Sequence, residues 1–88
     1  MAFKVYNFGL VKDLPKIITV DRSGMTLSDL FDYLESEMHS QIKSRALEAD
    51  GRLADRTGIA INGYPQYELD AVIPDDSQVL MTHLLPGG

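Results

Sequence analysis

The chain has 88 residues, enough for one small hydrophobic core and too few for a second domain. Hydrophobic residues make up 44% of it and charged residues 24%, a composition typical of a soluble globular domain that folds alone. Its 13 acidic and 8 basic side chains give a net charge of −5, which argues against binding to nucleic-acid phosphates and favours a basic protein partner.

Two further absences narrow the class of protein. No apolar run approaches the roughly 20 residues needed to cross a bilayer, and MAFKVYNFG lacks the basic-then-apolar layout of a signal peptide, so we expect a cytoplasmic protein without a membrane partner. The chain also has no cysteine. Disulfides, thiolate zinc sites, iron–sulfur clusters and cysteine nucleophiles are therefore excluded.

The first two expected elements are strands. FKVYNF, residues 3–8, alternates in the period-2 pattern of a strand, and KIITV, residues 16–20, is rich in β-branched side chains. Gly9 and Pro15 bracket the short connection between them. We expect these two strands to pair antiparallel.

We expect a helix next, because the apolar residues change from alternate positions to a spacing of three and four residues. One helical stripe is formed by Leu27, Leu30, Phe31, Leu34 and Met38. Thr26 is a natural N-cap, and Asp29 three residues later can complete a capping box. From 39 to 57 the sequence is polar, and the loose spacing of its apolar residues predicts a second short helix ended by a turn at Asp50-Gly51.

The last third of the chain predicts a hairpin and a final strand. A strand over 59–61 leads into Asn62-Gly63, which suits a type I′ turn, and then into a short strand carrying Tyr67 and Leu69. Pro65 has no backbone donor, so we expect that short strand at an edge. A turn over 74–77 precedes a strand, VLMTHLL, that runs into PGG.

This order of elements predicts an α+β domain with a mixed four- to five-stranded sheet and one main helix packed on one face. The β-grasp (ubiquitin-like) arrangement fits it best, and there the last strand lies centrally, beside the first strand. We expect a single domain over 1–88 with a flexible C-terminal tail over 84–88.

The sequence offers no specific catalytic or metal constellation. His39 and His83 have no partner at metal-ligand spacing, and Asp75 and Asp76 beside Pro74 suit a turn. We therefore expect no metal ion, no catalytic residues and no bound cofactor.

Five segments in order resemble the MoaD/ThiS family of ubiquitin-like sulfur carriers over the whole chain. They are FKVYNFGLVKDL, VDRSGMTLSDLFDYL, LEADGRLADRTGIAINGY, IPDDSQVLM and the closing GG. Two positions depart from the family pattern: Asp76 stands where Gly is common, and Leu84-Leu85-Pro86 stand where prolines and small residues are more usual.

The resemblance implies that the Gly88 carboxylate is adenylated by a MoeB/ThiF-type partner, which uses ATP and Mg, and is converted to a thiocarboxylate that donates sulfur. Molybdopterin synthesis is the pathway we favour, with thiamin thiazole or cysteine as the other recipients. The partners implied are the adenylating enzyme and a sulfur-accepting enzyme, such as the large molybdopterin synthase subunit or a thiazole synthase. The chain itself would be a carrier or non-catalytic small subunit.

Gly87 and Pro86 would help to thread the tail into the partner, because glycine allows close backbone approach and proline stiffens the chain before it. If Val79 and Met81 face the helix, an apolar docking patch should form on the opposite face of the sheet. Its expected members are Tyr6, Phe8, Leu80, Thr82 and Leu84.

Three alternatives stay open from the sequence. The patch residues could instead cover a second small core beneath residues 39–57. Gly88 could be joined to lysines of other proteins, which would make the chain a ubiquitin-like modifier. The chain could also be a non-covalent interaction module with an inert tail.

Overall fold

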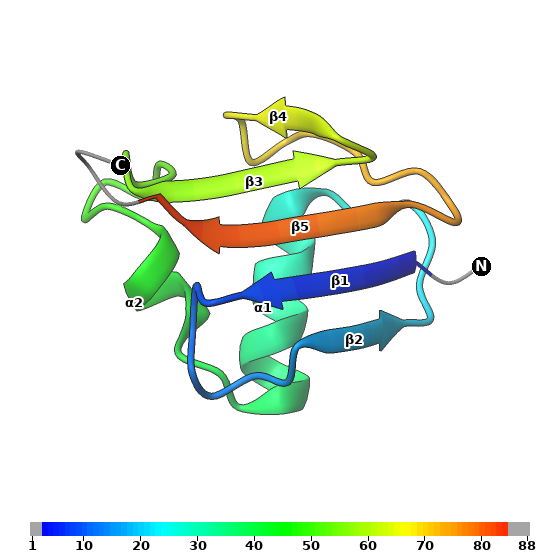
Figure 1. The fold of residues 1–88 in the computed structure, drawn as a ribbon, viewed down its shortest axis with the longest axis horizontal. Coiled ribbons are helices and arrows are strands. Elements are labelled where there is room, and N and C mark those ends of the chain that lie inside the picture. The colour runs from blue at the N-terminus through cyan, green and yellow to red at the C-terminus, as the bar shows by residue number, and fades with distance from the viewer. Residues whose placement is uncertain (1–2, 85–88) are drawn as a thin grey trace.

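The computed structural model describes residues 3–84 and contains five strands and two helices (Figure 1). The elements are β1 (Phe3–Phe8), β2 (Ile17–Val20), α1 (Leu27–Met38), α2 (Ile42–Ala46), β3 (Thr57–Ile61), β4 (Tyr64–Gln66) and β5 (Gln78–His83). No helix in this range is long and apolar enough to cross a membrane.

The strands form one mixed sheet in the order β2-β1-β5-β3-β4 (Figure 1). β1 pairs antiparallel with β2 as expected, while β5 lies between β1, to which it is parallel, and β3, to which it is antiparallel. The predicted α+β class, the β-grasp arrangement and the central place of the last strand are confirmed.

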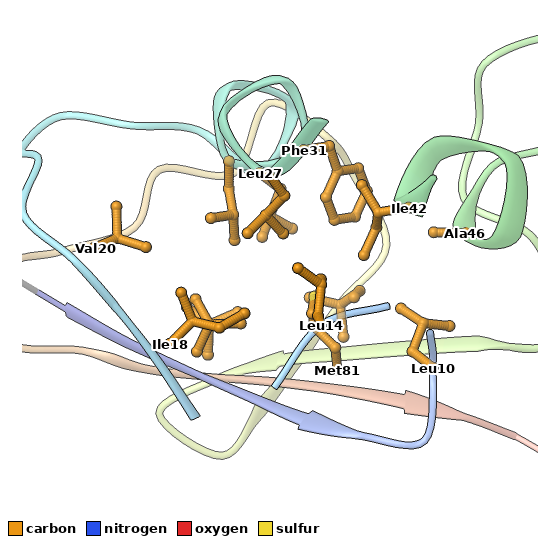
Figure 2. Packing of buried hydrophobic residues seen from close by; sticks show 14 of the residues in the cluster. Leu10, Leu14, Ile18, Val20, Leu27, Phe31, Ile42, Ala46 and Met81 are labelled. Carbon is orange, nitrogen blue, oxygen red and sulfur yellow. The ribbon is translucent and has the colours of Figure 1, made fainter. Parts of the chain in front are cut away.

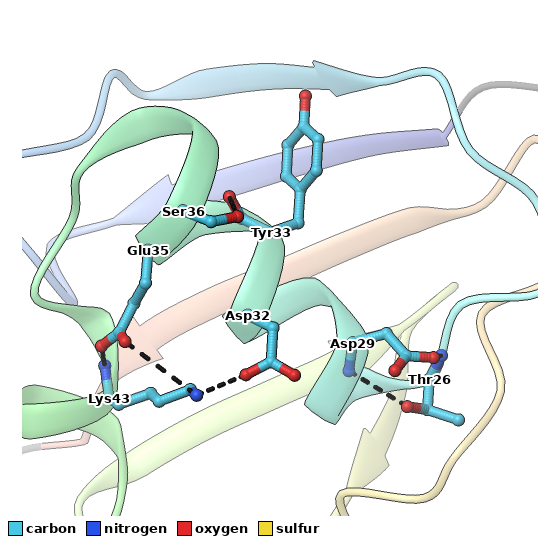
Figure 3. Close-up of polar contacts among 7 residues, drawn as sticks. All are labelled: Thr26, Asp29, Asp32, Tyr33, Glu35, Ser36 and Lys43. Atoms are coloured by element: carbon cyan, nitrogen blue, oxygen red, sulfur yellow. Dashed lines mark hydrogen bonds and ion pairs between the residues drawn. The ribbon is translucent and has the colours of Figure 1, made fainter.

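Helix α1 covers one face of the sheet, and its N-terminus has the predicted capping box (Figures 1 and 3). The Asp29 amide donates to Thr26 Oγ1 at 3.1 Å, and the Thr26 amide donates to Asp29 Oδ2 at 3.0 Å. These two bonds satisfy donors that a helix start leaves without intrahelical partners. The predicted apolar stripe faces the sheet, with Leu27, Leu30 and Leu34 fully buried.

The core lies between the sheet and both helices (Figure 2). Ile42 and Ala46 of α2 are fully buried in the same cluster as Phe31, Val79 and Met81. Residues 39–57 therefore add to the main core. The alternative of a second core, formed by this segment over the patch residues, is wrong.

Helix α2 is shorter than predicted. The Ala46 carbonyl accepts hydrogen bonds from the Ala54 amide at 2.8 Å and from Thr57 Oγ1 at 3.0 Å, and the helix ends there. Beyond it Leu47 forms a β-bridge with Leu53, so Asp50-Gly51 turns a small loop. The turn was predicted correctly, but it does not end the helix.

The β3–β4 hairpin has the predicted turn but a different second strand. Asn62 and Gly63 have φ values of +53° and +86°, as a type I′ turn requires. A two-residue turn makes β4 begin at once, so its register pairs Ala60 with Pro65 and the strand ends at Gln66. The prediction that it carries Tyr67 and Leu69 is wrong; that it lies at an edge is confirmed.

The same turn fixes the start of β5. Asn62 Oδ1 accepts from the Gln78 amide at 2.9 Å, and Asn62 Nδ2 donates to Ser77 Oγ at 3.2 Å. Asp76, where the resemblance would favour glycine, has a φ of +62°. The turn before β5 therefore uses a left-handed position that an aspartate tolerates better than most residues.

Candidate functional site

An apolar row crosses the face of the sheet that α1 leaves open. The strand registers place its members directly opposite one another, in the order Ile17, Tyr6, Leu80, Ala60 and Pro65. Directly paired residues share a face. The row therefore spans all five strands.

The alternation in β5 is as predicted. Val79 and Met81 are fully buried against the core, whereas Leu80 between them is partly exposed on the open face. The predicted docking residues Tyr6, Leu80 and Thr82 are all partly exposed.

A second row lies closer to the end of β5. Phe8, Thr82 and Gly58 are opposite one another in β1, β5 and β3. Thr82 Oγ1 donates to the Phe8 carbonyl at 3.2 Å, which joins the ends of the two strands. The Phe8 side chain is 56% exposed and its ring stacks on Tyr6, with centroids 6.1 Å apart. Tyr6 and Phe8 thus form one aromatic surface beside β5.

Leu84, the first residue of the expected tail, still contacts β3. Its amide donates to the Arg56 carbonyl at 2.6 Å, and its side chain lies over Gly58. A β-carbon at Gly58 would be 3.2 Å from Leu84 Cγ and Cδ2. The position of Leu84 after β5 therefore depends on the absence of a β-carbon at Gly58.

Two shallow apolar hollows lie on either side of Leu80 and Ala60. One, of about 260 Å³, is bounded by Thr82, Leu84 and Pro65, and the other, of about 440 Å³, by Tyr6, Phe8 and Gln78. Leu80 and Ala60 line both. The open face therefore has a ridge between two recesses, a shape that can receive apolar side chains of a partner.

The strands that form this face carry no acidic side chain. Strands β1 to β5 contain no aspartate or glutamate, whereas helices and loops hold all 13 of them. On α1, Asp32 pairs with Lys43 Nζ, and Glu35 Oε1 lies 4.0 Å from the same nitrogen (Figure 3). The hydrogen bond to Asp32 raises the pKa of Lys43. Negative charge is thus concentrated on the helices and loops and not on the strands of the open face.

The loop after β1 is anchored by two polar side chains, the buried Asn7 and the exposed Asp13. Asn7, 4% exposed, donates from Nδ2 to the carbonyls of Val11 at 2.7 Å and Leu14 at 3.1 Å, and its Oδ1 accepts from the Val11 amide at 3.3 Å. Asp13 then accepts from the Gln41 amide at 2.8 Å and from Ser40 Oγ at 2.7 Å. These bonds lower the pKa of Asp13, the Gln41 amide most.

A third hollow, of about 710 Å³, lies elsewhere, between residues 48–55 and 67–69. Its Asp50 carboxylate is already paired with Arg52 Nε at 2.9 Å, and the bond from the Arg52 amide lowers the pKa of Asp50. Residues 3–84 contain no group of three or more histidine, aspartate or glutamate side chains able to hold a metal ion.

The structure brings five of the eight predicted site residues onto one face: Tyr6, Phe8, Leu80, Thr82 and Leu84. Pro86, Gly87 and Gly88 lie outside the described residues. Sequence reasoning missed Ile17, Gly58, Ala60 and Pro65 as members of the face. Only Gly58 carried a signal, because glycine inside a strand often marks a close approach.

Comparisons with solved structures find close likenesses over the full domain. Small archaeal modifier protein SAMP1 from Haloferax volcanii matches with a TM-score of 0.76 at 19% identity, covering 100% of both chains. A chain of the Amycolatopsis orientalis BexX/CysO complex matches with a TM-score of 0.75 at 22% identity, covering 98% of this chain and 99% of that one. The Haloferax volcanii HVO 2177 protein matches at 0.70 and 21% identity, covering 100% of this chain and 87% of that one.

Neither a scan against protein-family models nor a search of curated proteins finds a significant match. The structural likenesses agree with the strand order β2-β1-β5-β3-β4 and with α1 packed on one face. The chain therefore has the β-grasp, ubiquitin-like fold.

Proposed function

We propose that this chain is a ubiquitin-like sulfur carrier whose reacting group is the Gly88 carboxylate. The observation that carries the proposal is the position of β5. It is held between two neighbouring strands, β1 and β3, and it is the last element before the C-terminal residues, in a sheet whose strands carry no carboxylate. The likeness to a small archaeal modifier protein and to the chain from the BexX/CysO complex supports this general kind of function.

The chemistry begins with activation, because a carboxylate is a poor electrophile. A MoeB/ThiF-type partner, using ATP and Mg, would join the Gly88 carboxylate to the α-phosphate of ATP and release pyrophosphate. The outer sulfur of a partner's persulfide would then attack the adenylate and displace AMP, which gives an acyl disulfide. A second thiol would reduce that disulfide, releasing the terminal thiocarboxylate and forming a new disulfide with the partner's remaining sulfur. The thiocarboxylate is a soft nucleophile, so no cysteine in the carrier is needed.

The residues before Gly88 would serve delivery. Threading a tail through a narrow channel requires close backbone approach, which Gly87 permits because it has no Cβ. Pro86 would reduce the entropy lost when the tail becomes ordered. Leu84, bonded to Arg56, would fix where the tail begins. The carrier would thus supply the reacting group and the partner would supply catalysis.

Docking would use the open face. Tyr6, Phe8, Leu80 and Leu84 offer apolar surface, and the two hollows beside Leu80 offer complementary shape. A partner surface that is mainly apolar would fit here better than the basic surface suggested by net charge alone, because no strand residue is acidic.

The recipient we favour is molybdopterin synthesis in the cytoplasm, with the large molybdopterin synthase subunit as the accepting partner. Thiamin thiazole synthesis and cysteine synthesis would use the same thiocarboxylate. Addition of purified accepting enzymes to the thiocarboxylated chain, one class at a time, would identify the recipient by transfer of the sulfur.

A second candidate is a ubiquitin-like modifier joined to lysines through Gly88. The likeness to a protein titled a small archaeal modifier favours it. Both functions need the same adenylated terminus. Conjugates of higher mass that disappear when Gly88 is deleted would identify the modifier, whereas a thiocarboxylate without conjugates would identify the carrier.

The adenylation common to both can be tested directly. With a MoeB/ThiF-type enzyme, the chain should support exchange of labelled pyrophosphate into ATP, and the chain lacking Gly88 should support none. Equal exchange with and without Gly88 would contradict the proposal.

A further inference from the structure

The outer edge of β2 is an open sheet edge. Among the described strands, β2 has β1 on one side and no strand on the other. The Asn7 amide donates to the Lys16 carbonyl at 2.7 Å, which fixes the alternation of the β1–β2 ladder. In an antiparallel pair every second residue directs its N–H and C=O outward. Here those residues are Ile17 and Thr19, and both are exposed.

The two edges of the sheet differ in how well they are protected. At the other edge, β4 has only three residues, and its middle residue is Pro65, which has no N–H. Short strands and prolines are the usual protection against further pairing. Strand β2, Ile-Ile-Thr-Val, has neither proline nor charge and is entirely β-branched. Of the two edges, only β2 therefore retains the features that favour strand addition.

Charge gives this edge a preference for one kind of strand. Through Arg22 the sequence holds four basic and two acidic side chains, a net charge of +2, whereas the remainder holds four basic and eleven acidic ones, a net charge of −7. One of the two acids, Asp13, already accepts bonds from Ser40 and Gln41. The β1–β2 hairpin is thus the positive part of an acidic protein.

The ends of β2 carry part of that positive charge. Lys16 immediately precedes the strand, and Arg22 follows it by two residues with its guanidinium 5.3 Å from the centre of the Tyr33 ring. Figure 3 shows Tyr33 pointing away from the side of α1 that carries Asp32. A strand added to β2 would therefore have Ile17 on one side and the Tyr33 and Arg22 pair on the other. Lys16 would lie at one end of it, and Arg22, next to Asp21, at the other.

We infer that the outer edge of β2 is a second docking site, which binds an extended, acid-flanked apolar segment of a partner protein by strand addition. Main-chain bonds to Ile17 and Thr19 give the affinity, and Lys16 and Arg22 select acidic flanks. This site does not depend on chemistry at Gly88. A partner bound here would be held while the tail acts elsewhere.

The test uses two blocked synthetic peptides, EVTVTVED and its basic counterpart KVTVTVKK, titrated into the full ¹⁵N-labelled chain. The acidic peptide should shift the amide signals of Ile17–Val20 and bind about tenfold more tightly than the basic one at low salt. Thr19→Pro removes an outward N–H without removing a bond to β1, and should weaken binding of the acidic peptide about tenfold or more. The matched control Thr19→Ala keeps the N–H and should bind within about twofold of the original chain.

If Thr19→Pro does not fold, Lys16→Glu provides the second test and should abolish the preference for the acidic peptide. Failure of both peptides to bind, or equal binding to Thr19→Pro in its folded form, would overturn the inference. A concentration-dependent dimer in sedimentation that Thr19→Pro abolishes would also overturn it, because the edge would then pair with a second copy of this chain.

Discussion

A β-carbon placed on Gly58 would lie 2.9 Å from Cγ2 of Thr82 on the neighbouring strand, closer than real β-carbons approach such atoms. Thr82 cannot turn away without losing the bond from its Oγ1 to the Phe8 carbonyl. We expect Gly58→Ala to lower the free energy of unfolding by about 1 kcal/mol, measured by urea denaturation. Leu84, 3.2 Å from the same point, should change its amide chemical shift.

A double variant separates this contact from other effects of alanine in a strand. Thr82→Ser removes Cγ2 but keeps the hydroxyl oxygen. The double variant, Gly58→Ala with Thr82→Ser, should therefore lose at least about 0.5 kcal/mol less free energy of unfolding than the sum of the two single losses. Strict additivity of the two single losses would show that the close approach does not control stability here.

The open face can be tested at Leu80, which lines both hollows. Leu80→Ser should reduce the rate of adenylation at low carrier concentration about tenfold or more, because a central apolar contact with the activating enzyme is lost. Val72→Ser is the matched control, since Val72 is 60% exposed and lies outside the five strands. A similar decrease in both variants would argue against docking through this face.

Asn7 should contribute strongly to stability although it is polar. Asn7→Ala removes three hydrogen bonds and leaves the Val11 amide and the carbonyls of Val11 and Leu14 without their partner. We expect a loss of about 2–4 kcal/mol in the free energy of unfolding, with faster hydrogen exchange at Val11. Ser36→Ala, at an exposed helical position, should change stability by less than about 0.5 kcal/mol. Equal effects of the two substitutions would contradict the anchoring role of Asn7.

Local patterns predicted most of this fold because the deciding interactions are close in sequence. The capping box joins Thr26 to Asp29, and the Asn62-Gly63 turn needs only its own two φ angles. The end of α2 was missed because the Ala46 carbonyl is bonded by Ala54 and Thr57, which come later in the chain.

The residues of the candidate site also divide into those that local sequence predicts and those that depend on tertiary structure. Alternation within β5 was enough to predict that Leu80 and Thr82 lie on the open face. Ile17, Ala60 and Pro65 were missed because their membership depends on the registers between strands, which no single strand reveals. The role of Gly58 depends on where Leu84 passes, which is a tertiary relationship.

Asp13 should contribute to the pH dependence of stability. Its pKa in the folded chain is lowered, first by the Gln41 amide and then by Ser40, so its contribution is present above the unfolded pKa of about 4 and is lost as the pH falls through the lower folded value. Asp13→Asn, which can accept only through its one remaining oxygen, should be less stable at neutral pH.

Urea denaturation between about pH 2 and pH 7 measures this difference. The gap between the original chain and Asp13→Asn should narrow below about pH 4, whereas Asp55→Asn, at another exposed carboxylate, serves as the control. A gap that stays constant over the whole range would show that ionisation of Asp13 plays no part.

The central claim is that the Gly88 carboxylate becomes a thiocarboxylate. The most direct measurement is the intact mass of the chain after incubation with ATP, Mg, a MoeB/ThiF-type enzyme, a persulfide donor and a thiol reductant, followed by mass analysis of its C-terminal fragment. We predict a mass gain equal to the replacement of one oxygen by sulfur, confined to the fragment that contains Gly88 and dependent on ATP. A mass that stays unchanged with activating enzymes of each class would contradict the account.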